Sequence, residues 1–242
     1  MKQSQFEFYN TDKSFDSAVE ILKVLYPYFK GVKNFQDVGS GVGAWSKVME
    51  NLGFNDYLLI DHPAIQKDKL LIENKDAFLP IDLDKEIPPI RKFDLSICIE
   101  VLEHFEENRA FDILDYLTES SDLILFSAAV PFQKGNGHIN EKNHSFWHNQ
   151  FQKRGYQFFD GFKRGDLLCK SNRSNFFHFQ NIFLYFRSDK LIFPRELNIT
   201  SDNFELRSTY YLNKDFTISD SLKILKKAIF NSIERALKFL SL

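Results

Sequence analysis

Apolar residues near the start of the chain recur at the spacing of an amphipathic helix. Gly31 follows them, at a point where a helix should stop, and the stripe itself comprises Phe15, Val19, Leu22, Leu25, Tyr26 and Phe29. A stripe of this kind is buried against another element. The pattern therefore predicts a helix that leads into the core domain and packs on it.

Beyond this helix, short β-rich runs alternate with amphipathic segments. The runs predict strands at 34–38, 56–60, 93–99 and 123–126, and the segments predict helices at 44–52, 106–117 and 145–153. Such alternation is typical of a mainly parallel sheet with helices on both faces. The aromatic runs 156–159 and 179–186 predict an antiparallel edge of the same sheet. The predicted fold class is therefore α/β, with a Rossmann-like sheet.

Two segments fall outside this rhythm. Residues 160–177 predict a loop of a length that is uncommon unless functional or mobile, and its basic residues either bind a phosphorylated acceptor or are solvated. Past Pro194 the chain becomes more polar, and residues 219–242 predict an amphipathic helix with five Lys or Arg against two acids. We therefore expect a main domain over 1–190 and an extension over 191–242.

Three roles stay open for the predicted terminal helix. It packs on its own domain, joins two chains, or makes a peripheral contact with an anionic membrane. Packing is the default for an amphipathic helix. The pattern of residues does not separate the three roles.

Composition narrows the class of protein. A chain of 242 residues suits one large domain with a small appendage, and a net charge of -2 lacks the basic excess of proteins that bind mainly nucleic acid. Cys98 and Cys169 stand far apart, which indicates neither a disulfide framework nor a cysteine metal site. No stretch has the length of a membrane span or a signal peptide. A cytoplasmic location is the expectation.

A glycine-rich turn joins the first predicted strand to the helix after it. Asp37 ends the strand, and three glycines at alternate positions, 39, 41 and 43, precede the helix. Glycines allow the backbone to approach a ligand, and a helix N-terminus presents unpaired N–H groups. Dinucleotide enzymes use G-x-G-x-x-G instead, and an acid repels their pyrophosphate but attracts an amino-acid ammonium. The turn therefore favours S-adenosylmethionine (SAM) over NAD.

With this motif, D-x-G-x-G-x-G, the sequence resembles the class I SAM-dependent methyltransferases over about residues 35–186. The resemblance implies that Asp61, at the end of the second strand, holds both ribose hydroxyls and that Asp82 accepts from the adenine amino group. An acid in a Pro- and Asp-rich loop such as that of Asp82 is equally often a solvated turn residue. The implied cofactor contacts are Asp37, Gly39, Ser40, Gly41, Gly43, Trp45, Asp61, His62, Asp82, Leu83 and Glu100.

The acceptor is expected beyond the fourth and fifth strands, where ligands of such sheets bind. A hydroxyl acceptor needs a base, and His138 is the first choice because histidine titrates near neutral pH and glycines border its loop. His104 is the second choice. The predicted catalytic set is His138, His104, Glu100 and Glu103, and the predicted substrate contacts are Asn140, Glu141 and Trp147. Trp147 could stack on a sugar, although an aromatic residue at helical spacing is usually core.

The string Glu100-x-x-Glu103-His104 also resembles a cluster that binds a divalent ion in small-RNA 2'-O-methyltransferases and some ubiquinone-pathway O-methyltransferases. In those enzymes a more distant side chain completes the site. A metal would lower the pKa of an acceptor hydroxyl and replace a protein base. The same E-V-L-E-H string is widespread in class I methyltransferases that use no metal, so a divalent metal stays open but is not favoured.

Residues 126–131, with 137–141 and 146–147, resemble a subgroup of bacterial methyltransferases often encoded among sugar and polysaccharide biosynthesis functions. This resemblance implies O-methylation of a sugar or related group in a surface glycan such as capsule or lipopolysaccharide, with a small-molecule or glycan-precursor acceptor. Other hypotheses stay open: a metal-dependent RNA 2'-O-methyltransferase or another small-molecule O-methyltransferase, an NAD-dependent dehydrogenase or epimerase, and a methyltransferase-like scaffold without turnover.

Overall fold

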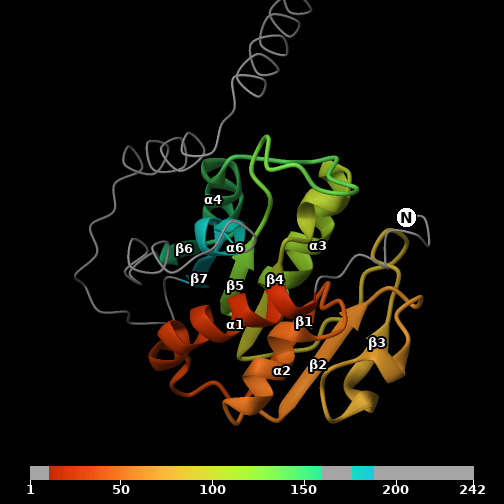
Figure 1. The fold of residues 1–242 in the computed structure, drawn as a ribbon. Helices are drawn as coiled ribbons and strands as arrows, with labels where there is room; N and C mark the ends of the chain where they lie inside the picture. The colour runs from red at the N-terminus through yellow and green to blue at the C-terminus, as the bar shows by residue number, and fades with distance from the viewer. Residues whose placement is uncertain (1–10, 160–175, 188–242) are drawn as a thin grey trace, which may run out of the picture. The chain divides into compact units, whose positions relative to one another are not determined.

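A seven-stranded sheet forms the centre of the protein in the computed structural model, which describes residues 11–159 and 176–187 (Figure 1). The strand order is β3-β2-β1-β4-β5-β7-β6. The strands are β1 (Asn34–Val38), β2 (Asp56–Asp61), β3 (Phe78–Pro80), β4 (Leu95–Ile99), β5 (Leu123–Ser127), β6 (Tyr156–Phe159) and β7 (Phe183–Arg187). All pairs from β3 to β5 are parallel, and β7 pairs antiparallel with both β5 and β6. The Rossmann-like, mostly parallel sheet predicted above is confirmed.

Helices cover both faces of this sheet. They are α1 (Thr11–Leu25), α2 (Ala44–Asn51), α3 (Glu107–Ser120), α4 (His144–Lys153) and α6 (Phe176–Asn181), with short 3-10 helices at Tyr26–Phe29, Lys67–Lys69, Lys75–Ala77 and Leu102–His104. No helix within residues 11–159 and 176–187 has the length and apolarity needed to cross a membrane.

The first helix layer, α1 and α2, lies in front of the strands in Figure 1. It packs on the side of the sheet that carries Phe35, Ile97 and Leu125. Leu22 and Leu25 of the predicted N-terminal stripe are buried here, whereas Tyr26 is half-exposed. Tyr26 departs from the pattern because the α-helix ends at Leu25 and the tighter 3-10 turn that follows points its side chain elsewhere.

The second layer, α3 and α4, packs on the opposite side of the sheet. Tyr116 of α3 donates a 2.7 Å hydrogen bond to Gln36 of β1. Phe151 of α4 stacks on Tyr185 of β7, with ring centroids 3.7 Å apart. Alternate residues of each strand thus pack against the two helix layers in turn, as expected for a sheet that is buried on both faces.

Two of the predicted strands start later in the structure, and two others, β2 and β5, extend one residue further than predicted. The predicted strand 179–186 is wrong over its first part, because residues up to Asn181 belong to α6 and β7 starts at Phe183. An aromatic run carries no clear period, so helix and strand look alike in it. Phe93 forms only an isolated bridge with Ser121, and β4 starts at Leu95. The short strand β3 was not predicted.

Several predicted features lie outside the described residues. They are the domain limit between 190 and 191, the loop 160–177 up to residue 175, and the terminal helix 219–242.

The order of the strands locates the place where a ligand is expected. The chain builds the sheet outward from β1 to β3 and then returns to the other side of β1 with β4. This reversal makes the carboxyl ends of β1 and β4 the topological switch point, where open α/β sheets bind their ligands. The glycine turn follows β1 there, and Glu100 follows β4.

Candidate active site

The glycine turn lies at the switch point and has no room for side chains at two of its positions. Gly39, Gly41 and Gly43 have φ values of 72°, 56° and 83°, in the left-handed region that favours glycine. A Cβ added to Gly39 would lie 2.4 Å from Cγ2 of Val101, and one added to Gly43 would lie 2.7 Å from Cδ2 of Leu59. Gly39 therefore brings the turn into direct contact with the segment after β4.

Asp61 ties the end of β2 to this turn. Its Oδ2 accepts from the backbone N–H of Gly41 at 2.6 Å, and its Oδ1 accepts from that of His62 at 2.6 Å. Burial raises the pKa of Asp61, and the two N–H groups oppose that rise. Each carboxylate oxygen has a second lone pair. The side chain can still accept two hydrogen bonds from a ligand.

Asp37 is a buried acid at the end of β1. Its Oδ2 accepts a 2.6 Å hydrogen bond from the hydroxyl of Ser46 on α2. Burial raises the pKa of Asp37 to about 7, with a smaller rise from the charge of Asp61, while the Ser46 hydroxyl opposes the shift. A carboxylate held in this way favours a cationic ligand group beside it.

Replacement of Asp37 by asparagine is expected to stabilise the ligand-free protein at pH 8. Since the folded pKa of about 7 exceeds the ordinary 3.8, the unfolded chain loses the proton first, and stability falls as pH rises between these values. Asp37→Asn removes this loss in the free energy of unfolding, which amounts to at most about 4 kcal/mol. The measurement is the free energy of unfolding of both proteins, by calorimetry at pH 4.5 and at pH 8.

The matched control for this prediction is Asp56→Asn, at an exposed residue that begins β2. It makes the same change of charge without burial, so we expect its stability relative to the wild type to be nearly the same at both pH values. An Asp37→Asn protein that is less stable than the wild type at pH 8 would contradict the cost of burial inferred for this carboxylate.

His62 and Asp82 form a pair next to the end of β2. Nε2 of His62 lies 3.4 Å from Oδ2 of Asp82, and Nζ of Lys85 lies 2.5 Å from the same oxygen. Burial alone would raise the pKa of Asp82, but the Lys85 ammonium and the Asp84 N–H bring it below the ordinary value. The backbone carbonyl of the buried Leu83 accepts from Arg109. Asp82 therefore has the contacts of a turn residue, and a role toward adenine stays a prediction.

Glu100 follows β4 in a left-handed conformation, with φ of 55°. Its Oε2 accepts from Nε2 of Gln133 at 2.5 Å, and its Oε1 accepts from Nδ2 of Asn181 at 3.3 Å. Its backbone N–H donates to Ser127 at the end of β5. A non-glycine residue in this region of φ is strained and needs support from its surroundings. The two amides and Ser127 supply that support.

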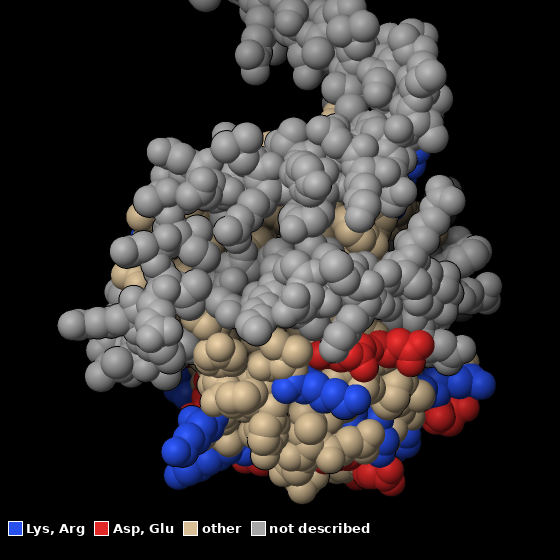
Figure 2. Space-filling model, turned by 60° about the vertical axis from the view of Figure 1, so that its left-hand side comes forward, with Lys and Arg blue, Asp and Glu red and all other residues tan. Residues whose placement is uncertain are grey.

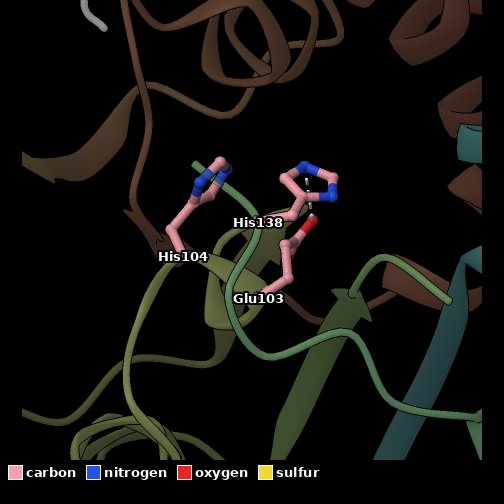
Figure 3. A group of neighbouring side chains, drawn as sticks. All are labelled: Glu103, His104 and His138. Atoms are coloured by element: carbon pink, nitrogen blue, oxygen red, sulfur yellow. Dashed lines mark ion pairs between the residues drawn. The ribbon is translucent and has the colours of Figure 1, made fainter. Parts of the chain in front are cut away.

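Three side chains from the segment after β4 and the loop after β5 gather in one cluster (Figure 3). The nearest ligating atoms of Glu103, His104 and His138 all lie within 4.8 Å of one another. Nε2 of His138 is 4.0 Å from Oε1 of Glu103, and the two imidazole rings are nearly perpendicular, at 84°. Glu103 is fully buried, and neither carboxylate oxygen has a hydrogen-bond partner among the described residues.

Burial dominates the protonation of this cluster. It raises the pKa of Glu103 well above the ordinary value, and the negative charge of Glu100 acts in the same direction. It lowers the pKa of His104, as does the neighbouring His138. A neutral imidazole beside a buried carboxyl group is suited to proton transfer or to metal binding. Glu100 lies next to this cluster, and its own carboxylate accepts hydrogen bonds from Gln133 and Asn181.

Two of the predicted substrate contacts instead support the loop that carries His138. Glu141 accepts from the backbone N–H groups of Phe132, at 2.8 Å, and Lys134, at 3.1 Å, and it lies 3.1 Å from Nδ1 of His138. Asn140 is buried, and its backbone N–H donates to the carbonyl of Glu103 at 3.0 Å. Nδ2 of Asn140 also donates to the carbonyl of Leu102 at 3.5 Å, so both side chains have structural partners within the protein.

Trp147 does not belong to the site. It is 1% exposed and packs edge-on against Phe126 of β5, with centroids 5.6 Å apart. The ring offers no face to a sugar, so the predicted substrate contact is corrected to a core position, the alternative that helical spacing favoured. Trp45 is likewise buried, with its ring against that of His178 on α6.

Several residues of the site were missed in the sequence. Gln133 and Asn181 hold Glu100, Ser46 holds Asp37, and His178 of α6 bonds to the hydroxyl of Ser17 on α1 at 3.0 Å. Gln133 lies in the loop after β5, where the acceptor was expected, and could have been included among the predicted residues. The others carry no local signal, because polar side chains inside helices usually face solvent.

Comparison with known proteins identifies the class to which this fold and site belong. A family model described as a methyltransferase domain matches residues 11–159. Since this is more than half of the chain, the protein belongs to the methyltransferase domain family. The predicted class I, Rossmann-like fold agrees with this membership.

Solved structures add likeness at the level of the fold. Mitomycin 7-O-methyltransferase is 15% identical to this protein, with a TM-score of 0.52. The matched region covers 72% of this chain and 54% of the chain of that enzyme. Magnesium protoporphyrin IX methyltransferase from Synechocystis PCC 6803, with bound SAH, is 17% identical with a TM-score of 0.51, covering 73% and 84%. The chain thus spans about half the length of the first and most of the second. No sequence among the curated proteins matches significantly.

Proposed function

We propose that this protein is a SAM-dependent methyltransferase that transfers a methyl group to an oxygen atom of a small acceptor. The observation that carries the proposal is the contact between Gly39 and Val101. This contact sets the cofactor turn against the segment that bears Glu100, Glu103 and His104. Methyl transfer is an in-line displacement, which requires the donor and acceptor sites to adjoin in this way.

The charges around the turn favour SAM over NAD. Asp37 and Asp61 are both buried acids at the ends of adjacent strands, and their charges interact. SAM carries an ammonium and a sulfonium, and both positive groups are attracted to such a site. It also carries a ribose, and Asp61 can accept hydrogen bonds from the two ribose hydroxyls. A pyrophosphate at the same place would be repelled.

His138 is proposed to accept the proton of the acceptor hydroxyl. Glu141 engages its Nδ1, which leaves Nε2 directed toward the cluster. As the acceptor oxygen bonds to the methyl carbon, the carbon–sulfur bond breaks, its electron pair returns to sulfur, and the hydroxyl proton passes to Nε2. The products are the methyl ether, neutral S-adenosylhomocysteine (SAH) and a protonated histidine that releases its proton to solvent.

A divalent cation at the same cluster is the second candidate for activating the acceptor. The unpartnered carboxylate oxygens of Glu103 and the two imidazoles form a suitable donor set. When bound, a cation would supply Lewis-acid lowering of the hydroxyl pKa. Glu103, His104 and His138 would hold the cation, and Glu141 would orient the ring of His138 through its contact with Nδ1.

Calorimetric titration of the chelator-treated protein with Mn²⁺ and Mg²⁺ separates the two candidates. Saturable binding that Glu103→Gln abolishes supports the cation. Absence of heat, together with turnover in excess chelator, supports His138 as the base.

The acceptor is proposed to be a sugar or a related group of a surface-glycan precursor, supported by the resemblance of residues 126–131 and 137–141. The two structural neighbours are named for small acceptors, mitomycin and magnesium protoporphyrin IX. On the described surface seen in Figure 2, positive and negative side chains are interspersed, without the continuous basic patch that RNA binding requires.

Transfer of labelled methyl from SAM to a panel of nucleotide sugars, phenols and short RNA tests the proposal. Labelled nucleotide sugar is the expected product. Methylated RNA that requires Mn²⁺ or Mg²⁺ would favour the RNA 2'-O-methyltransferase instead. SAM binding without transfer to any class of acceptor would favour a scaffold without turnover.

A further inference from the structure

Asn181, the last residue of α6, uses every hydrogen-bonding position of its buried amide. Its Nδ2 donates to Oε1 of Gln133 at 2.7 Å and to Oε1 of Glu100 at 3.3 Å. Its Oδ1 lies 3.0 Å from Nε2 of His144 and accepts from Gln180 at 3.3 Å. Since Nδ2 donates to Gln133 and Glu100, it is Oδ1 that faces His144, and the ring nitrogen Nε2 is then the donor of that bond.

Gln133 closes a triangle between these side chains. Its Nε2 donates to Oε2 of Glu100 at 2.5 Å, while its Oε1 accepts from Asn181 and from the backbone N–H of Val130 at 3.2 Å. The two oxygens of Glu100 therefore receive one amide each. Because Glu100 is in a strained backbone conformation, these amides determine where its carboxylate points.

The triangle lies between the two halves of the site. On the cofactor side, Glu100 precedes Val101, which contacts Gly39 of the cofactor turn. On the acceptor side, the neighbours of Gln133 in the chain, Phe132 and Lys134, donate their N–H groups to the carboxylate of Glu141.

Glu141 in turn contacts Nδ1 of His138. Phe132 and Lys134 both have positive φ, 75° and 62°. Their strained backbone conformation therefore also depends on the hydrogen bonds to Glu141. A short chain of hydrogen bonds and peptide bonds thus connects the Glu100 carboxylate to His138.

We propose that Asn181 and Gln133 are positioning residues that couple occupation of the cofactor site to the conformation of the loop carrying His138. The inference rests on the proposed function, since it takes Glu100 to border the cofactor. A bound cofactor fixes Glu100, and the two amides then hold residues 130–134 in the conformation in which Glu141 orients His138. Acceptor binding is accordingly stronger after the cofactor than before it.

Hydrogen exchange of the Phe132 and Lys134 amides, with and without saturating SAH, tests the coupling. In the wild type SAH is expected to slow their exchange at least about tenfold. Asn181→Asp keeps the shape but replaces the donor with an oxygen facing Glu100. We expect it to weaken SAH binding about tenfold and, at saturating SAH, to lose the added protection of the loop.

A second variant tests the coupling from the other amide of the triangle. Gln133→Glu keeps the shape of the side chain but replaces the donor that faces Oε2 of Glu100 with an oxygen. We expect it, like Asn181→Asp, to lose the SAH-dependent protection of the loop. If Asn181→Asp does not fold, Gln133→Leu at a half-buried position carries the same expectation of lost protection.

The control is Tyr116→Phe, which removes a buried hydrogen bond between α3 and Gln36 of β1, outside the triangle. It is expected to lower stability and to leave SAH-dependent protection unchanged. Full protection in saturated Asn181→Asp, or equal loss in Tyr116→Phe, would overturn the proposal. Failure of the wild type to bind SAH would overturn the proposed function instead, so the two failures are distinguishable.

Discussion

Gly39→Ala is expected to abolish cofactor binding while the protein stays folded. The new Cβ would lie 2.4 and 2.7 Å from the two Cγ atoms of Val101, at a φ of 72°. The left-handed backbone costs about 1 kcal/mol and the forced displacement of Val101 about 1–3 kcal/mol more. Since Gly39 is part of the turn that we propose holds the cofactor, we expect SAH affinity to fall at least about 100-fold, measured by calorimetry.

Gly53→Ala is the matched control for this prediction. Gly53 has a φ of 98°, but a Cβ there would meet no atom within 4 Å. The control therefore isolates the backbone strain, about 1 kcal/mol, and should bind SAH normally. Adding Val101→Ala to Gly39→Ala removes both Cγ contacts, leaves the Cβ at 3.2 Å, and should recover part of the stability. Equal SAH affinity in the two glycine variants would contradict the role of the turn.

His138→Gln is expected to lower kcat by about 10²–10⁴-fold with the SAH dissociation constant unchanged within about twofold. The reason is the position of its Nε2, which faces the Glu103 cluster while Glu141 holds Nδ1. Glutamine fills similar space but cannot accept and release the proton. The measurement is steady-state methyl transfer to the acceptor identified in the panel described above, beside calorimetry with SAH.

The control for this prediction is His148→Gln, whose ring packs against Phe158 away from the cluster, with centroids 4.2 Å apart. It should retain kcat. A His138→Gln protein with more than half of the wild-type kcat would show that neither a base nor a cation ligand is needed at this position.

Sequence patterns predicted the fold well where the local preference of a segment for strand, helix or turn agrees with its place in the folded sheet. The strands 34–38 and 156–159 have the predicted limits, since each is a short β-rich run bounded by turn residues. The glycine turn was also recognisable, because its chemistry depends on backbone freedom that only glycine provides. The sequence also placed the acceptor beyond the fourth and fifth strands, and the strand order in the structure then locates the switch point at β1 and β4.

The support of the site could not be predicted in the same way. Gln133 meets Glu100 across 33 positions of sequence, Asn181 meets Gln133 across 48, and Asn181 meets Glu100 across 81. No periodicity links residues at such separations. The helix α6 was itself hidden in an aromatic run that was taken for a strand. The loop around His138 was predicted by position, but the structural roles of Asn140 and Glu141 follow only from their contacts.

Calorimetric titration of the purified protein with SAM, SAH and NAD, repeated with Asp61→Ala, tests the central claim most directly. The account predicts saturable binding of SAM and SAH and no binding of NAD. It also predicts that Asp61→Ala, which loses the carboxylate at the turn, binds SAH at least about tenfold more weakly. Binding of NAD, or no binding of either adenosyl ligand to the folded protein, would contradict it.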